Sequence, residues 1–138
     1  MRPMTPDPTP TFDARDVPST ITPSEPSEYD RGVIRQLWLD HGDTGAERQI
    51  CRTITALEGA LAGADRAIAD GRLAEVSTYA RQISRLGASI GFRSVARIAP
   101  MVEETAIRRD PAAVASTLAR LTRHCDRSIY EIWDISGT

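Results

Sequence analysis

The chain has 138 residues and a formal net charge of −2, from 17 basic and 19 acidic residues. This length suits one domain with a modest core, and the near balance of charge argues against a strongly basic nucleic-acid-binding protein. We expect no membrane span, because no stretch approaches about 18 consecutive apolar residues. The first residues lack the apolar run of a signal peptide, so we expect a cytoplasmic protein.

Residues 1–27 contain seven of the nine prolines, mixed with threonine, serine and aspartate. Proline has no backbone N–H and disfavours helix at the residue before it. This composition predicts a flexible, disordered leader. The folded domain is predicted to cover residues 28–138.

From Tyr29 onward the apolar residues recur at helical spacing, and no period-two alternation competes with that pattern. A short first helix is predicted to stop near 41–42. A second helix of about 24 residues is predicted to end at 70–71, where a glycine can adopt the left-handed cap. Inside this helix, Gly59 and Gly63 are predicted to let a neighbouring helix approach closely. The second helix carries a one-sided stripe formed by Ile50, Ile54, Leu57, Leu61, Ala64 and Ile68.

Three more helices are predicted beyond this point. The third closes at Gly91, and the fourth contains Pro100, which is expected to kink it. The last opens with Asp110 as cap and Pro111 in its first turn. Helices with such narrow stripes and short connectors predict an all-α fold, an antiparallel up-and-down four-helix bundle with a short extra N-terminal helix.

Few residues suggest chemistry. His41 is interpreted as capping a helix end, and His124 as lying on a helix flank among arginines. Cys51 and Cys125 have no CxxC spacing and are interpreted as small buried hydrophobic residues, so no disulfide, metal site or cofactor is predicted. No carboxylate pair or phosphate-binding loop suggests catalysis.

One segment, ARQISRLGASIGF at residues 80–92, resembles the signature of histidine-containing phosphotransfer domains. In that family the phosphorylated histidine is followed by lysine at the third position, glycine at the fourth, a small residue at the sixth and glycine at the tenth. When the segment is aligned on the final glycine, Gly87 occupies the sixth position and Gly91 the tenth. The order of predicted helices from about Tyr29 to Ile135 is also similar to that of the family.

The segment departs from the family at the positions that carry the chemistry. Arg81 stands at the phosphoacceptor position, Ser84 at the lysine position and Arg85 at a glycine position. A guanidinium group is permanently protonated and has no lone pair to accept a phosphoryl group. The resemblance therefore implies a pseudo-phosphotransfer domain that is not an enzyme and has no catalytic residue.

The resemblance implies a role in two-component phosphorelay signalling, by binding a response-regulator receiver domain or a histidine kinase. Helix geometry places the two arginines on an outward face, one turn apart. Two alternatives remain open: an active phosphotransfer protein that uses His41 or His124, and a generic helical adaptor unrelated to phosphorelay. The oligomeric state also remains open. The predicted partner-binding residues are Arg81, Ser84, Arg85 and Ala88, and the predicted motif turn is formed by Gly87 and Gly91.

Overall fold

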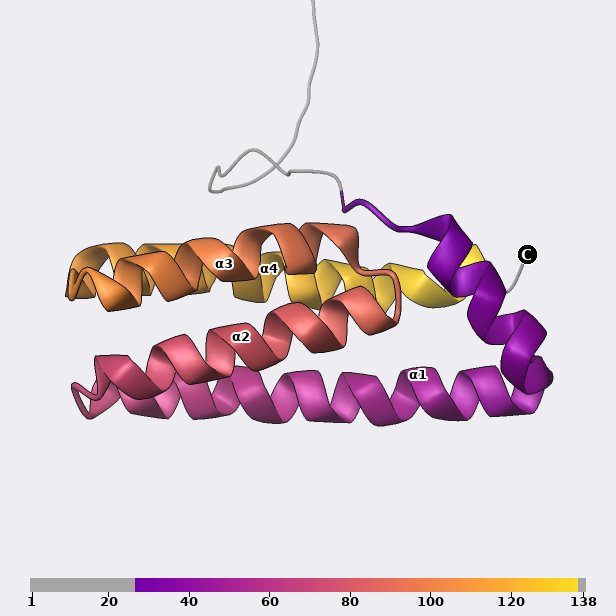
Figure 1. Cartoon of the computed structure of the whole chain (residues 1–138), viewed down its shortest axis with the longest axis horizontal. Helices are drawn as coiled ribbons and strands as arrows, with labels where there is room; N and C mark the ends of the chain where they lie inside the picture. The colour runs from indigo at the N-terminus through magenta and orange to yellow at the C-terminus, as the bar shows by residue number, and fades with distance from the viewer. Residues whose placement is uncertain (1–26, 137–138) are drawn as a thin grey trace, which may run out of the picture.

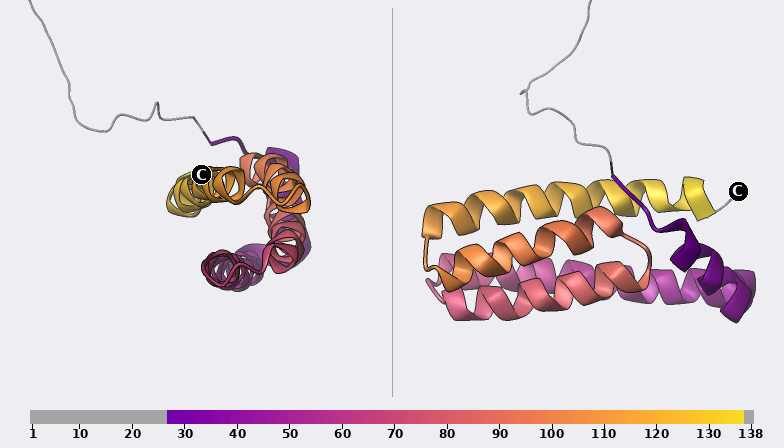
Figure 2. Two further views of the ribbon diagram at one scale, coloured as in Figure 1. Left: turned by 90° about the vertical axis from the view of Figure 1, so that its left-hand side faces the viewer. Right: turned by 45° about the horizontal axis from the view of Figure 1, so that its top comes forward.

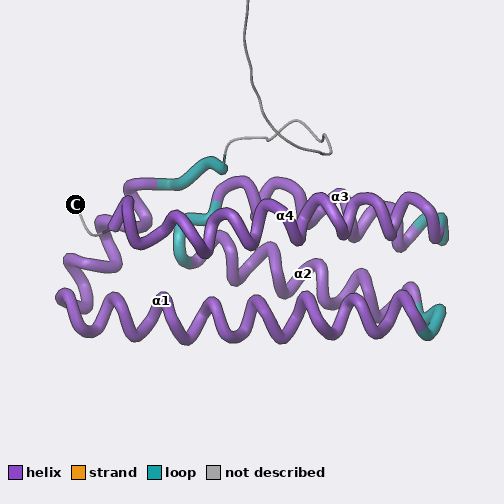
Figure 3. Tube along the Cα trace, turned by 180° about the vertical axis from the view of Figure 1, so that it is seen from behind, coloured by secondary structure: helices purple, strands orange, loops and turns teal. Residues whose placement is uncertain are grey.

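A computed structural model describes residues 27–136, so the predicted leader up to residue 26 lies outside the described part. Four helices make up nearly all of this region, and they run up and down with short turns between them (Figures 1 and 3). The predicted all-α, antiparallel four-helix bundle is confirmed. The helices are α1 (Arg31–Ala69), α2 (Leu73–Ser89), α3 (Arg93–Ile107) and α4 (Pro111–Ser136).

Seen end-on, the four helices follow one another around an open arc (Figure 2, left). Each packs mainly on its neighbours in the sequence, whereas α1 and α4, at the two ends of the arc, contact each other much less. The α2–α3 pair therefore forms the middle of the arc.

A sharp bend divides α1 into the short and long helices that the sequence predicts. Gly42 has φ 72° and ψ 175° there, a backbone conformation that only glycine adopts without strain. The segment before the bend crosses the end of the bundle beside the last turns of α4 (Figure 1). Its Ile34 side chain is buried in the core.

Glycines end both α1 and α2. Gly71 has φ 74°, as the predicted left-handed cap requires, and Gly91, where the next helix is predicted to close, has φ 78°. After α2, the N–H of Phe92 donates to the carbonyl of Gly87 at 2.8 Å, and the N–H of Gly91 donates to that of Ala88 at 3.2 Å. These paired bonds satisfy carbonyls that the end of the helix would otherwise leave open.

The turn from α3 to α4 uses a different residue for the same geometry. Arg109 has φ 57°, and the next N–H, from Asp110, donates to the carbonyl of Thr105 at 3.3 Å. The Asp110 carboxylate then accepts the N–H of Ala113 at 3.1 Å, which confirms the predicted cap of the last helix.

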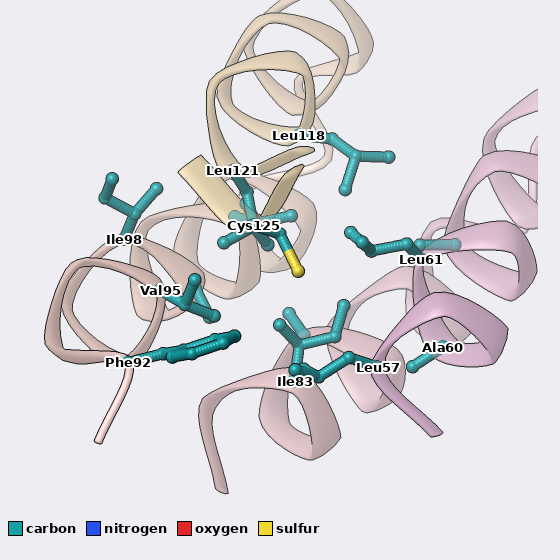
Figure 4. Packing of buried hydrophobic residues seen from close by; sticks show 14 of the residues in the cluster. Leu57, Ala60, Leu61, Ile83, Phe92, Val95, Ile98, Leu118, Leu121 and Cys125 are labelled. Atoms are coloured by element: carbon teal, nitrogen blue, oxygen red, sulfur yellow. The ribbon is translucent and has the colours of Figure 1, made fainter. Parts of the chain in front are cut away.

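The predicted apolar stripes form one core between the helices (Figure 4). Every predicted stripe residue of the second helix is either buried or packed against this core. The sulfur of Cys125 points into its centre, toward side chains of α1 and α2 (Figure 4). The largest fully buried side chains are Phe92, Ile50, Leu57, Ile83, Ile90, Ile98, Leu121, Ile132, Val76, Val95, Val102 and Val114.

Two expectations for α1 are wrong. Cys51 is exposed, because it follows the buried Ile50 by one position and so points about 100° away around the helix. Gly59 is also exposed, and no atom lies within 4 Å of the position that a Cβ would take there, so it allows no close approach. The expectation holds for Gly63, where a Cβ would lie 2.5 Å from the ring of Tyr79 on α2.

The segment just before α1 is tied to α3 and α4. The N–H of Glu28 donates to Oγ of Ser94 at 2.7 Å, at the start of α3. The Tyr29 ring packs at 78° to the ring of Phe92 with centroids 6.0 Å apart, and its hydroxyl donates to the carbonyl of Ser128 on α4 at 3.3 Å. The chain therefore joins the bundle from Glu28 onward.

Candidate functional site: the exposed face of α2

The predicted partner-binding residues divide between two faces of α2. Arg81, Arg85 and Ala88 are exposed, whereas Ser84 is half-buried. The opposite face, with Ile83 at its centre, is buried in the core. The two arginines are thus presented outward, as helix geometry predicts.

Arg81 is bound to α3. Its Nη1 donates to Oε2 of Glu103 at 2.9 Å, and its Nη2 lies 3.5 Å from the hydroxyl of Thr78. Glu104, the next residue on α3, instead pairs with Arg108 at 2.7 Å. The sequence analysis did not predict this ion pair between Arg81 and Glu103.

A signal for this pair is present in the sequence. Arg81 and Glu103 lie at similar distances on either side of the turn at Gly91. In an antiparallel helical hairpin, two such residues come to the same level. The pair depends on how α2 and α3 are aligned in the hairpin, and the apolar pattern of either helix alone does not give that alignment.

Arg85 lies one turn beyond Arg81 on the same face. Within residues 27–136 it makes no ion pair or hydrogen bond. Its charge is therefore open to an external carboxylate, whereas Glu103 already pairs with Arg81. The exposed residues that follow toward the end of α2, Ala88 and Ser89, have small side chains.

Ser84 faces α3 rather than solvent. Pro100 has no N–H, so the carbonyl of Ala96, four residues earlier, lacks its usual helical donor. The Ser84 hydroxyl donates to this carbonyl at 3.3 Å. Helix α3 continues through Pro100 to Ile107, and Ser84 links α2 to the point where the proline interrupts the backbone bonding.

Both motif glycines are required by close packing. A Cβ on Gly87 would lie 2.8 Å from Cγ1 of Val95, so this glycine lets α2 and α3 approach. A Cβ on Gly91 would lie 2.8 Å from the carbonyl oxygen of Asp30 and 2.9 Å from Cγ1 of Ile34. These glycines fix α2 against α3 and against the first turn of α1.

The other reactive groups are divided between surface and core. His41 is exposed beside the bend at Gly42, but His124 is 4% exposed and lies in the core rather than on a flank. Cys125 is buried as predicted, and burial, with a smaller contribution from nearby carboxylates, raises the pKa of its thiol to about 12. His41 is therefore the one histidine of the chain that an external phosphoryl donor can reach.

In the described part of the chain, no three histidine, cysteine or acidic side chains come together in a way that would hold a metal ion. None of its helices combines the length and the apolar character that crossing a membrane demands. No protein-family model, curated protein or solved structure matches the chain. The interpretation of the α2 face therefore depends on its own residues.

Proposed function

We propose that the protein acts in two-component signalling as a phosphotransfer-deficient domain that binds the acidic phosphoacceptor pocket of a response-regulator receiver domain. The observation that carries this proposal is the exposed guanidinium pair, Arg81 and Arg85, in the middle of α2. The resemblance places the phosphorylated histidine of the family at the first of these two positions. The proposal locates the protein in the cytoplasm, where it would meet such partners.

The chemistry of arginine supports binding without transfer. The resemblance implies that a receiver surrounds its phosphoacceptor aspartate with further carboxylates and a magnesium ion. Guanidinium groups form charge-assisted hydrogen bonds with carboxylates but have no nucleophilic lone pair. An arginine in this place binds the pocket and leaves the phosphoryl group on its aspartate.

The contacts of α2 support a fixed presentation of this face. Ser84 bonds the backbone of α3, and Gly87 allows the two helices to pack closely. A binding residue on a rigid helix loses less conformational freedom when it binds than one on a loop. The same face also suits a histidine kinase that docks through a receiver-like surface.

The chemical test is a phosphotransfer assay. Incubated with a phosphorylated receiver and magnesium, the wild-type protein acquires no acid-labile phosphate. Arg81→His alone restores little, because Ser84 and Arg85 remain. The triple change Arg81→His, Ser84→Lys, Arg85→Gly is expected to restore more phosphorylation than Arg81→His alone, although it removes the bonds of Arg81 to Glu103 and of Ser84 to α3.

Efficient phosphorylation of the unmodified protein contradicts this proposal and favours active phosphotransfer. The exposed His41 is then the first candidate, and His41→Gln removes the phosphate if it is the acceptor. His124→Gln is the less useful variant, because His124 is buried and its replacement disturbs the core.

An exposed aromatic pair favours a second candidate, the generic helical adaptor. Tyr130 is 83% exposed and Trp133 is 39% exposed, three residues apart on α4. Aromatic side chains of this kind are common anchors at protein interfaces. If no receiver domain binds the wild-type protein, the adaptor becomes the better interpretation, and Tyr130→Ala is the variant that tests it.

A further inference from the structure

We infer that Glu103 is a built-in competitor for the partner's carboxylates, and that it makes Arg85 the first contact and Arg81 the second. This inference rests on the proposed function, because it concerns how the same face binds an acidic pocket. In the free protein the Glu103 carboxylate forms an ion pair with the guanidinium of Arg81. A partner carboxylate that binds Arg81 at the same place must displace Glu103.

The geometry makes Glu103 an effective competitor. Its Oε2 lies 2.9 Å from Nη1 of Arg81, the distance of a charge-assisted hydrogen bond. The Glu103 side chain is only 26% exposed, whereas that of Arg81 is 50% exposed. The carboxylate is thus less exposed than the arginine that it binds, and the arginine side chain stays half open to solvent.

The surrounding charges single out this pair. Glu104 is bound to Arg108 and does not contact Arg81. Arg85, one turn along α2, has no ion pair in the region that the structure describes. An approaching acidic surface therefore meets the uncompensated charge of Arg85 first.

The size of the effect follows from the exposure of the pair. Ion pairs with this much solvent contact change an equilibrium constant by no more than about fivefold. Removing the Glu103 charge while keeping its shape, with Glu103→Gln, is therefore expected to tighten acidic partner binding about two- to fivefold. Glu104→Gln is the matched control, because it removes the same charge from the next position of the same helix.

The test is a calorimetric titration of a purified receiver domain against the wild-type protein, Glu103→Gln, Glu104→Gln, Arg81→Ala and the double variant Arg81→Ala/Glu103→Gln. Glu103→Gln is expected to tighten binding about two- to fivefold, and Glu104→Gln less than about twofold. In the Arg81→Ala background the Glu103→Gln gain is expected to disappear. Equal gains from the two glutamine variants, or a gain that persists without Arg81, would overturn the inference.

A second probe separates this inference from the proposed function. A hexa-aspartate peptide, titrated against the same variants and followed by the NMR signals of the arginine side chains, offers carboxylates without any receiver. If receivers fail to bind, but Glu103→Gln and not Glu104→Gln tightens peptide binding through Arg81, the inference about Glu103 is supported and the proposed function is contradicted. If receivers bind and the two glutamine variants behave alike, the proposed function is supported and the inference about Glu103 is contradicted.

Discussion

At two positions where the resemblance places phosphotransfer chemistry, the side chains of this protein bind α3. Arg81 pairs with Glu103, and Ser84 donates to the carbonyl of Ala96. Each of these two side chains therefore has a structural partner on α3. Replacing Arg81 by histidine or Ser84 by lysine would also remove a contact between the two central helices.

The Ser84 bond is tested by a double-mutant cycle with Pro100. Ser84→Ala is expected to lower the free energy of unfolding by about 1 kcal/mol, because the carbonyl of Ala96 then has no donor. In a Pro100→Ala background, residue 100 regains an N–H for that carbonyl, and the cost of Ser84→Ala falls to about 0.3 kcal/mol or less. Urea unfolding measures both.

Ser89→Ala is the control for that cycle, since the exposed Ser89 hydroxyl bonds only the carbonyl of Leu86 within α2. Its cost should not depend on residue 100. Equal costs of Ser84→Ala in the two backgrounds would contradict the role assigned to Ser84.

The buried thiol predicts an alkaline loss of stability. Burial raises the pKa of Cys125 from its ordinary 9.0 to about 12, and Asp126 and Glu58 add to the shift. The folded state favours the neutral thiol. The contribution of this thiol to the free energy of unfolding is therefore complete below pH 9 and is lost as the pH rises toward 12. Between pH 8 and pH 10 the free energy of unfolding is expected to fall by about 1 kcal/mol.

Urea unfolding across this range, on the wild-type protein, Cys125→Ala and Cys51→Ala, isolates that contribution. Cys125→Ala should flatten the pH dependence, and the exposed Cys51→Ala should leave it unchanged. The pKa of Tyr29 is also raised to about 12, by burial and by the charge of Glu131, but from 10.0, so it acts mainly above this range. An unchanged slope in Cys125→Ala would show that its thiol is not the group responsible.

At the scale of the element, the turn after α3 is the one that lacks a glycine. Arg109 holds φ 57°, where a Cβ is disfavoured. Arg109→Gly is therefore expected to raise the free energy of unfolding by about 0.5–1 kcal/mol, after the entropy cost of a new glycine in the unfolded chain. Thermal unfolding measures the gain.

Gly71→Ala provides the converse control, because Gly71 holds φ 74° in the equivalent turn after α1 and has open space around it. It should destabilise the protein by about 1 kcal/mol. No gain from Arg109→Gly alongside this loss would mean that the arginine side chain compensates for its backbone strain.

Helices and their ends were predictable because their signals are local. An apolar stripe, a glycine cap and the Asp110 cap can each be recognised from residues only a few positions apart in the sequence. The bonds of Arg81 and Ser84 to α3 were not predictable in this way, since they depend on the register between two helices. His124 lies three residues after the buried Leu121, which already places it on the core side of α4, but its arginine neighbours pointed to a flank.

In the molecule as a whole, the segment 28–30 connects the start of α1 to α3 and α4. Tyr29 contacts α3 and α4, and the Asp30 carboxylate accepts the first N–H groups of α1. Deleting residues 1–26 is expected to leave the thermal midpoint unchanged, because that proline-rich composition supplies few core-forming side chains. Deleting residues 1–30 removes a helix cap and a packed aromatic ring, and should cost at least about 2 kcal/mol.

Circular dichroism of the two truncated chains distinguishes these cases. A large loss on removing only 1–26 would show that the leader packs on the bundle. A negligible loss on removing 1–30 would contradict the role of Tyr29 and Asp30.

The central claim is that the arginine face of α2 binds a receiver domain. The most direct measurement is the affinity of a receiver for the wild-type protein and for the double variant Arg81→Ala/Arg85→Ala, at low and high salt. Desolvated contacts to the acidic pocket predict a loss of about 2–5 kcal/mol in the variant at both salt concentrations. Unchanged affinity in the variant would contradict the account, because it would mean that the receiver binds somewhere other than the exposed face of α2.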